Sequence, residues 1–271
     1  MLTARRRRPG GISRTVVTES TCTTPAVSRV DPVTESVPNF PALRASTALG
    51  YWFSAFVLGN LASLVAVVLV WRGQVTDTVP IWVTGISAGV MWLVFAAFLR
   101  LVSHGTGSGS MRHDFGFALR RNDLWVGVPL GVFSQLVLVN LVNWPLSRVF
   151  PGQFSPDKVE ERARSIADSA PGAWVVLLVV VVVVAAPLIE ELMYRGLIQQ
   201  GLANSFGPVR GWVLGAVVFA AIHFAPVEFP GLFVFALVLG WCYRRTGRLG
   251  MGIITHMAFN ATGLLVVMRV N

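Results

Sequence analysis

Residues 174–189 read Trp-Val-Val-Leu-Leu-Val-Val-Val-Val-Val-Val-Ala-Ala-Pro-Leu-Ile, and Glu190 and Glu191 follow directly. Arg195 lies four residues after Glu191. The apolar run is long enough to predict a membrane-spanning helix that continues through the glutamates to about Leu202. A charged side chain inside a membrane costs at least ~2.5–3.5 kcal/mol on insertion scales, so it usually marks a functional site.

The composition of the whole chain agrees with this interpretation, since 54% of its residues are hydrophobic and only 13% are charged. A water-soluble domain of this length needs more charge to cover its surface. We therefore expect an all-α fold, a polytopic bundle of about seven transmembrane helices (six to eight), in the cell membrane. This multi-pass domain is expected to cover residues 45–271.

Each expected span is an apolar run bounded by charged, glycine or proline residues. The runs cover residues 50–71, 79–101, 124–146, 174–202, 209–224, 232–243 and 251–267. Two short helices are expected between them, an interfacial helix over residues 111–121 and an amphipathic helix over residues 155–168 that starts at Ser155. In the interfacial helix, Phe115, Phe117 and Leu119 are expected to dip inward.

The net charge is +9 and is carried almost wholly by arginine. Arginines gather at the ends of apolar runs, where the positive-inside rule places them, and they predict a cytoplasmic N-terminus. This pattern argues against nucleic acid as a partner. Residues 1–44 are expected to form a disordered basic tail, whose Arg5–Arg8 cluster either contacts anionic lipid headgroups or only sets the topology.

Helical spacing separates the two glutamates. Glu191 and Arg195 are four residues apart, so they can pair on one face of a helix. Glu190 points about 100° away from Glu191 and lacks that partner. Pro187 removes one backbone hydrogen bond and can kink the helix just before them. A purely structural interpretation is that both glutamates only lock helices together through Arg195.

Two histidines in later apolar segments extend the candidate site. Glu190 and His223 lie equally far from the turn near Gly207, which places them at a similar depth in antiparallel helices. His256 and Asn260 are four residues apart and share a helix face, although His256 is expected to lie shallower than Glu190 unless the earlier helices extend further into the cytoplasm. Both polar side chains could instead serve as hydrogen-bonding contacts between helices.

Several other chemistries lack their sequence patterns. The chain has no His-Glu-x-x-His zinc motif and no Gly-x-Ser-x-Gly elbow, and no predicted span holds a deep aspartate. The acidic residue Glu228 lies between two prolines and is interpreted as an exposed loop residue.

Three separated motifs resemble those of the CPBP intramembrane protease family in order and spacing. This family contains the type II CAAX prenyl endopeptidases and bacterial proteins tied to bacteriocin processing and self-immunity. The likeness covers about residues 174–270, which would form the catalytic core. Segments 114–121 and 243–250 also look like this family. The motifs are Glu190-Glu191-x-x-x-Arg195, Phe219-x-x-x-His223 and His256-x-x-x-Asn260.

The resemblance implies peptide-bond hydrolysis inside the membrane. Glu190 would be the catalytic carboxylate and would activate a water molecule together with His223. His256 and Asn260 would stabilise the oxyanion or help to hold the water.

Glu191 and Arg195 would then be supporting residues. The family is often described as metalloproteases, and Glu190, His223 and His256 could ligate zinc. The same residues could equally perform acid–base chemistry without a metal, so the sequence leaves the cofactor open between zinc and none.

The expected partners are the lipid bilayer and a membrane-associated peptide or protein substrate. Many Gly, Ala and Val residues and an excess of Arg over Lys suggest a bacterial genome, so a substrate other than a prenylated CAAX protein is expected. Two alternatives stay open: a non-catalytic immunity or peptide-binding protein that retains the motif, and a transporter that uses Glu190 and His223 as a proton relay.

Overall fold

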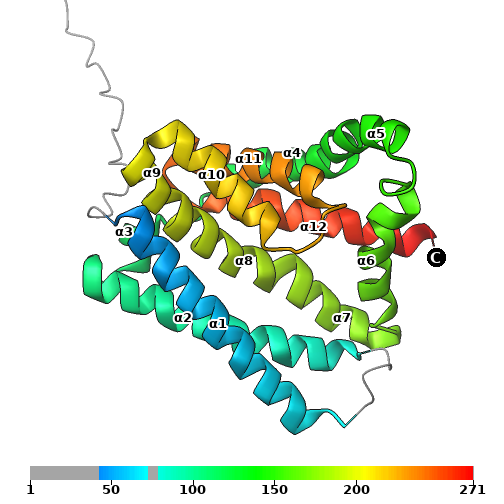
Figure 1. The fold of residues 1–271 in the computed structure, drawn as a ribbon, viewed down its shortest axis with the longest axis horizontal. Coiled ribbons are helices and arrows are strands. Elements are labelled where there is room, and N and C mark those ends of the chain that lie inside the picture. The colour runs from blue at the N-terminus through cyan, green and yellow to red at the C-terminus, as the bar shows by residue number, and fades with distance from the viewer. Residues whose placement is uncertain (1–42, 73–78, 271) are drawn as a thin grey trace, which may run out of the picture. The chain divides into compact units, whose positions relative to one another are not determined.

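The computed structural model describes residues 43–72 and 79–270, and the part it describes is built from helices without a strand. This confirms the all-α polytopic bundle. Within residues 43–72 and 79–270, five helices are long and apolar enough to cross a membrane (Figure 1). They are Ala45–Val70, Ile81–Thr106, Arg121–Val149, Gly172–Phe206 and Gly250–Arg269.

The first two of these helices are α1 (Ala45–Val70) and α2 (Ile81–Thr106), and the last is α12 (Gly250–Val270). The third is continuous but contains a π-helical segment, and the fourth contains a 3-10 turn and two π-helical segments. The third consists of α4 (Arg121–Phe133), η1 (Ser134–Leu138) and α5 (Val139–Val149). The fourth consists of η2 (Gly172–Trp174), α7 (Val175–Leu178), η3 (Val179–Ala185), α8 (Ala186–Glu191), η4 (Leu192–Gln199) and α9 (Gln200–Phe206).

Two of the seven expected spans are shorter helices, α10 (Pro208–Ala221) and α11 (Phe229–Thr246). Both have a proline in the first turn, Pro208 in α10 and Pro230 in α11. Helix α10, with 14 residues, rises only ~21 Å against a hydrocarbon core of about 30 Å. The two helices pack against each other. The polypeptide therefore turns back after α10 while it is still at the level of the bundle interior.

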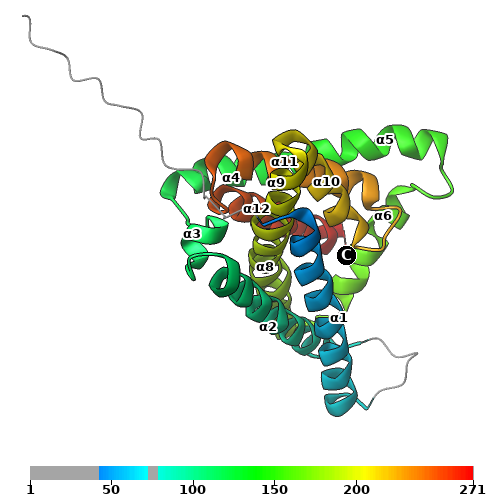
Figure 2. The same ribbon diagram turned by 60° about the vertical axis from the view of Figure 1, so that its left-hand side comes forward.

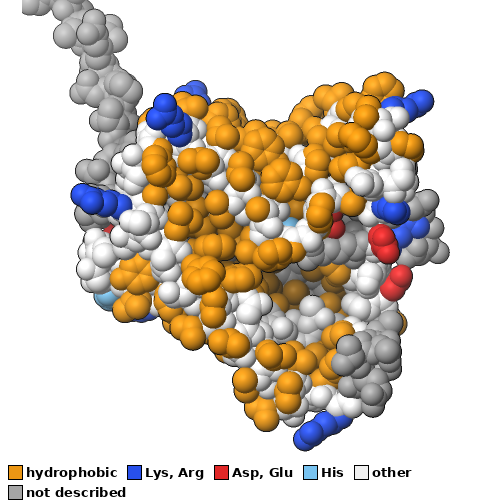
Figure 3. Space-filling model, in the orientation of Figure 1, with side chains coloured by type: hydrophobic (Ala, Val, Ile, Leu, Met, Phe, Trp, Pro, Cys, Tyr) orange, Lys and Arg blue, Asp and Glu red, His pale blue; other side chains and the backbone are white. Residues whose placement is uncertain are grey.

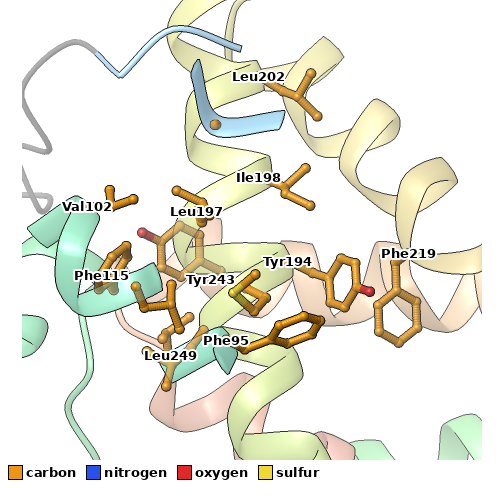
Figure 4. Packing of buried hydrophobic residues seen from close by; sticks show 14 of the residues in the cluster. Phe95, Val102, Phe115, Tyr194, Leu197, Ile198, Leu202, Phe219, Tyr243 and Leu249 are labelled. Carbon is orange, nitrogen blue, oxygen red and sulfur yellow. The ribbon is translucent and has the colours of Figure 1, made fainter. Parts of the chain in front are cut away.

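The helix Gly172–Phe206 lies at the centre of the bundle. Its successive parts contact α1, α2, α10, α11 and α12, and α8 runs between α1–α2 and the α10–α12 group (Figures 1 and 2). The buried cluster follows it, with Tyr194 edge-on to Phe219 at 5.2 Å between ring centroids and Leu197 near Phe115 (Figure 4). Residues 191–199 of this helix are therefore buried among several neighbours.

The interfacial helix predicted for residues 111–121 is shorter than expected. Only α3 (Met111–Phe115) is helical, because Gly116 follows it in the left-handed conformation (φ 68°). Phe115 is fully buried against Gly196 of the central helix, whereas Leu119 is exposed. The prediction that Phe115 and Leu119 would share an inward face was wrong, since the turn at Gly116 redirects the chain.

The amphipathic helix is close to its prediction. It is α6 (Pro156–Asp168), and the Ser155 hydroxyl accepts a hydrogen bond from the Lys158 N–H. The predicted disordered tail falls outside the described residues except for Leu43 and Arg44. Leu43 is buried and its carbonyl oxygen accepts a hydrogen bond from Asn204, so this residue of the predicted tail packs against the bundle.

Two segments that contributed to the family resemblance meet at the ends of their helices. The Arg248 guanidinium donates two hydrogen bonds to Asp123, at 3.0 and 3.1 Å, and one to the carbonyl of Ala118. The Leu249 N–H also donates to the Gly116 carbonyl. A paired arginine of this kind fixes both partners in orientation, so the α11–α12 turn is tied to the segment that precedes α4.

A buried carboxylate, Asp114, organises the end of α2. Burial by itself would raise the pKa of Asp114, but hydrogen bonds from the Ser103 hydroxyl and from the N–H and hydroxyl of Ser108 hold it below its ordinary value. Ionised Asp114 therefore stabilises the folded protein above about pH 4. This stabilisation is lost as the pH falls through the lowered pKa of Asp114.

Small residues allow α4 and α12 to approach closely. Gly127 and Gly131 lie one turn apart on α4, and a Cβ at Gly127 would lie 2.9 Å from the Ile254 side chain. A Cβ at Gly131 would collide with the Thr255 carbonyl oxygen and Ala258. Membrane helices pack in this way because lipid offers no hydrophobic driving force between them.

We expect Gly131→Ala to lower the thermal unfolding temperature in detergent, because the new methyl group meets backbone atoms that cannot move aside. Overpacking of this kind costs about 1–3 kcal/mol. Gly89→Ala is the matched control, since nothing lies within 4 Å of a Cβ at this α2 position. An unchanged unfolding temperature for Gly131→Ala would contradict the close packing of α4 on α12.

Candidate active site

The predicted site residues gather around one cavity of about 370 Å³. This volume is typical of sites for small ligands or peptide segments. The space-filling view shows that this face of the molecule is hollowed near its centre and is mostly apolar around the hollow (Figure 3). Four predicted residues line the cavity: Glu190, His223, His256 and Asn260.

Glu191 lies behind the cavity and is completely buried. Its Oε1 atom accepts a hydrogen bond from Arg195 Nη1 at 2.9 Å and lies 3.0 Å from His256 Nδ1. Its Oε2 atom faces Gly252, where a Cβ would come within 2.9 Å, and finds no hydrogen-bond donor in the described residues. The predicted pair of Glu191 and Arg195 is present, and His256 joins it.

Arg195 is held from several sides, as a buried cation must be. Besides Glu191, it donates a hydrogen bond to the Ala236 carbonyl at 3.3 Å. Its guanidinium carbon also lies 4.4 Å from the centre of the Phe219 ring, within the range of a cation–π contact. Helices α10 and α11 therefore both contact this one side chain.

His256 connects the buried pair to the cavity. Its Nδ1 atom faces Glu191, and its Nε2 atom lies 3.7 Å from Glu190 Oε2. The rings of Phe219 and Phe235 pack edge-on against the imidazole. Because 3.7 Å is longer than a hydrogen bond, Glu190 and His256 face each other without a direct bond.

Glu190 is the more accessible of the two glutamates, with 26% of its side chain exposed. A carboxylate at the wall of a cavity can reach a bound water or substrate, whereas one that is fully enclosed cannot. The adjacent positions 190 and 191 thus carry the same chemical group in two different environments, as the 100° helical offset predicts.

His223 shares the cavity with Glu190, but it does not lie in a helix as predicted. Helix α10 ends at Ala221, and Phe224 adopts a positive φ of 50°, so His223 lies in the turn. Its Nδ1 atom is 2.7 Å from the Phe219 carbonyl oxygen. A carbonyl oxygen only accepts, so Nδ1 carries the proton, and Nε2 is the acceptor of the neutral ring.

Asn260 is oriented by the central helix. Its Nδ2 atom donates a hydrogen bond of 2.8 Å to the Val182 carbonyl, in the π-helical segment η3. An amide nitrogen has two protons, so this bond uses one of them. The remaining proton is available for a second acceptor.

His256 was expected to lie shallower than Glu190 unless the earlier helices extended further, and the length of α9 provides that extension. Tyr243, near the end of α11, donates a hydrogen bond to Gln200, and Gln199 donates to the Gly240 carbonyl. The central helix then continues for six more residues, to Phe206. The α9–α10 hairpin thus extends beyond the turn between α11 and α12, which brings His256 level with the glutamates.

Three cavity-lining residues were missed or misread from the sequence. Glu228 was interpreted as an exposed loop acid, but it is half-buried and lines the cavity, because the turn after α10 folds back toward α8. Gln135 and Asn143 line it from η1 and α5. The sequence feature that could have identified Gln135 and Asn143 is their spacing: two amide side chains eight residues apart in an apolar span lie on one face of a helix.

A zinc site does not fit the donors that the structure brings together. Zinc sites in enzymes use three protein ligands and a water molecule. In the described part of the chain, no group of three His, Cys, Asp or Glu side chains is arranged to hold a metal ion. Glu190 and His256 approach each other, but His223 does not join them as a third donor of such a group.

The fold and site define a multi-pass helical membrane protein with a carboxylate–imidazole cluster at an internal cavity. Residues 172–262 match the sequence model of the family described as type II CAAX prenyl endopeptidase Rce1-like. The chain is also 20% identical over 229 residues to a Bacillus subtilis (strain 168) protein named "Putative membrane peptidase YdiL", covering 81% of this chain and 88% of that protein. No solved structure gives a significant match.

These two matches confirm the resemblance to the CPBP family that the motifs predicted, and they support a CAAX-protease-like membrane peptidase. The matched segment begins at η2 and ends two residues after Asn260. It therefore contains all seven residues named in the three motifs.

We expect Arg195→Met to destabilise the protein strongly, by about 3–5 kcal/mol, because it leaves the Glu191 charge buried without its cation. Thermal unfolding in detergent measures the effect. The double variant Glu191→Gln/Arg195→Met is expected to recover part of the loss, since neither charge is then buried. Arg245→Met is the control at an exposed position, and an equal loss there would refute the argument.

Proposed function

We propose that this protein is an intramembrane endopeptidase that hydrolyses a peptide bond of a membrane-associated protein or peptide. The observation that carries the proposal is the convergence of Glu190, His223, His256 and Asn260 on one cavity. These residues come from three separate parts of the sequence, so their meeting is not a consequence of local spacing. The family match and the peptidase-like relative agree with this chemistry.

Glu190 is assigned the role of general base. It is the accessible carboxylate of the cluster, so it can take a proton from a water molecule held in the cavity. His223 acts with it, since the proton on Nδ1 is used by the Phe219 carbonyl and leaves Nε2 as the acceptor of the neutral ring. Both groups would then orient the attacking water.

His256 and Asn260 are assigned to the oxyanion. Asn260 has one amide proton beyond the bond to Val182, and it can donate this proton to a developing negative charge. Glu191 lies 3.0 Å from Nδ1 of His256 and fixes the ring so that Nε2 faces the cavity. When protonated between Glu190 and Glu191, this ring offers a second donor to the oxyanion.

The reaction consumes one water molecule and one peptide bond. Glu190 accepts a proton from water, and the oxygen of the water adds to the scissile carbonyl carbon. The tetrahedral intermediate collapses with cleavage of the C–N bond, and Glu190 returns the proton to the leaving amine nitrogen. The products are a carboxylic acid and an amine, and each step uses only groups that line the cavity.

The substrate is proposed to reach the site from the bilayer of the cell membrane. The cavity lies among helices whose outer faces are apolar, so a segment that is already in the membrane can enter it without crossing water. The CAAX specificity in the name of the matching family requires a prenylated cysteine, and none of the site features described above selects a prenyl group over another apolar segment.

We expect Glu190→Gln to abolish cleavage of a quenched library of apolar peptides by the purified protein, with an unchanged unfolding temperature. His223→Ala is expected to do the same, with a loss of at least about 100-fold in kcat/KM. Glu161→Gln, an exposed acid on α6, is the control and should retain the activity of the wild type. Full activity of Glu190→Gln would contradict the role assigned to Glu190. If Glu190→Gln does not cleave peptides but still protects cells as well as the wild type in a bacteriocin-immunity assay, the non-catalytic peptide-binding alternative is favoured.

Chelation provides an independent test of the cofactor. Because the described donors form no three-ligand group, we expect cleavage to persist after dialysis against EDTA or 1,10-phenanthroline. Elemental analysis of the same preparation should find well under one zinc per chain. Loss of activity that returns on addition of zinc would show that the donors rearrange around a metal.

A further inference from the structure

Two carboxamide side chains line the cavity from a helix that the mechanism does not use. Gln135 lies in η1 and Asn143 in α5, and Val139 between them lines the same cavity. These three positions are spaced by four residues, so they form one face of the helix. The residues between them, such as Leu136 and Leu141, are exposed to the surroundings of the bundle.

The amide oxygen of Asn143 is unusual, because no donor from the described residues reaches it. Asn143 is only 9% exposed, and its Oδ1 atom finds no hydrogen-bond donor in the part of the chain that the structure describes. A buried amide oxygen without a donor is expensive, so native proteins rarely keep one unless something else supplies the donor. This side chain therefore indicates a ligand.

Glycines keep space open beside both amides. A Cβ at Gly231 would lie 3.2 Å from Val139 and 3.8 Å from Asn143 Nδ2. A Cβ at Gly263 would lie 3.3 Å from Gln135 Nε2. Both glycines line the cavity as well, so larger side chains at these positions would crowd the wall where the amides lie.

We propose that Gln135 and Asn143 bind the main chain of an extended peptide segment of the substrate. The proposal rests on the peptidase function and names how that substrate is held. A carboxamide has both a donor and an acceptor, which is what a peptide N–H and C=O require. An acyl chain needs neither group, and an anionic headgroup would be expected to select cations instead of neutral amides.

The membrane gives this recognition its purpose. A peptide must be unwound to expose a bond for cleavage, and its backbone groups then have no water to bond with. Amides on the cavity wall replace the hydrogen bonds that the unwound segment has lost. Hydrogen bonds to the main chain do not themselves require a particular side chain in the substrate.

The spacing sets the length of the segment. Eight residues of helix separate the two amides by ~12 Å along the helix axis. An extended peptide rises ~3.4 Å per residue, so the two contacts lie about four residues apart on it. The apolar walls between them, including Val139 and Val182, favour apolar substrate side chains.

The test measures binding of dansyl-labelled apolar peptides of about ten residues to the full-length protein in detergent, in the Glu190→Gln background that is expected to prevent cleavage. Asn143→Leu and Gln135→Leu should each weaken binding by about 10-fold, the effect of losing one hydrogen-bonding group. Asn140→Leu is the matched control on the same helix, because Asn140 is exposed and donates to its own helix at Leu136. It should change the dissociation constant by less than about twofold.

Peptides with one backbone amide replaced by an ester separate binding from folding. The ester lacks the N–H that would donate a hydrogen bond to Asn143 Oδ1. At one position of the peptide, the ester should therefore weaken binding about 10-fold when Asn143 is present. The same ester should not change the dissociation constant of the Asn143→Leu variant. A merely structural role for Asn143 would weaken the amide and ester peptides alike. If Asn143→Leu does not fold, Gln135→Leu and the ester series on the parent protein decide the question.

The outcomes for the two proposals differ. Cleavage by the wild-type protein without any effect of Asn143→Leu, Gln135→Leu or the ester series would overturn the amide contacts and leave the peptidase standing. Binding that depends on Asn143 without cleavage by the wild type would overturn the peptidase and leave the binding site. The absence of any bound peptide would overturn the inference.

Discussion

The structure depends on one buried charge, the carboxylate of Glu191. It is enclosed on all sides, so it must be paired within the bundle or neutralised. Arg195 pairs with it along the same helix, while His256 reaches it from α12. Arg195 in turn contacts the Ala236 carbonyl on α11 and the Phe219 ring on α10. One ion pair therefore fixes four helices, and the orientation of His256 toward the cavity follows from it.

The sequence predicts the parts of this arrangement that local geometry controls. The pair of Glu191 and Arg195 follows from four-residue spacing, and the shared cavity of Glu190 and His223 follows from their equal distance to the turn near Gly207. Both arguments need only the rise and periodicity of a helix. The all-α bundle is equally accessible, because the apolar runs are long and continuous.

Other features depend on tertiary packing and could not be read in advance. Gln135 and Asn143 sit in an apolar span, and only the rotation of that helix decides whether they face lipid or the cavity. Glu228 lies in a proline-rich turn whose direction is set by the early end of α10, at Ala221. His256 lies at the same depth as the glutamates only because α9 extends past the α11–α12 turn. Hydrophobicity alone does not reveal this extension, since helix ends are poorly marked in sequence.

The short length of α10 also explains why a cavity exists at all. A helix that crossed the whole bundle would fill the space beside α8 with its own side chains. Instead the chain turns at His223, so a polar turn lies beside Glu190 where a helix wall would otherwise be. Pro230 in the first turn of α11 favours the start of that helix soon after α10 has ended, so the unwound backbone between the two helices is short and lines the cavity. Irregular backbone inside a membrane is tolerated only in such places, so the turn and the cavity each require the other.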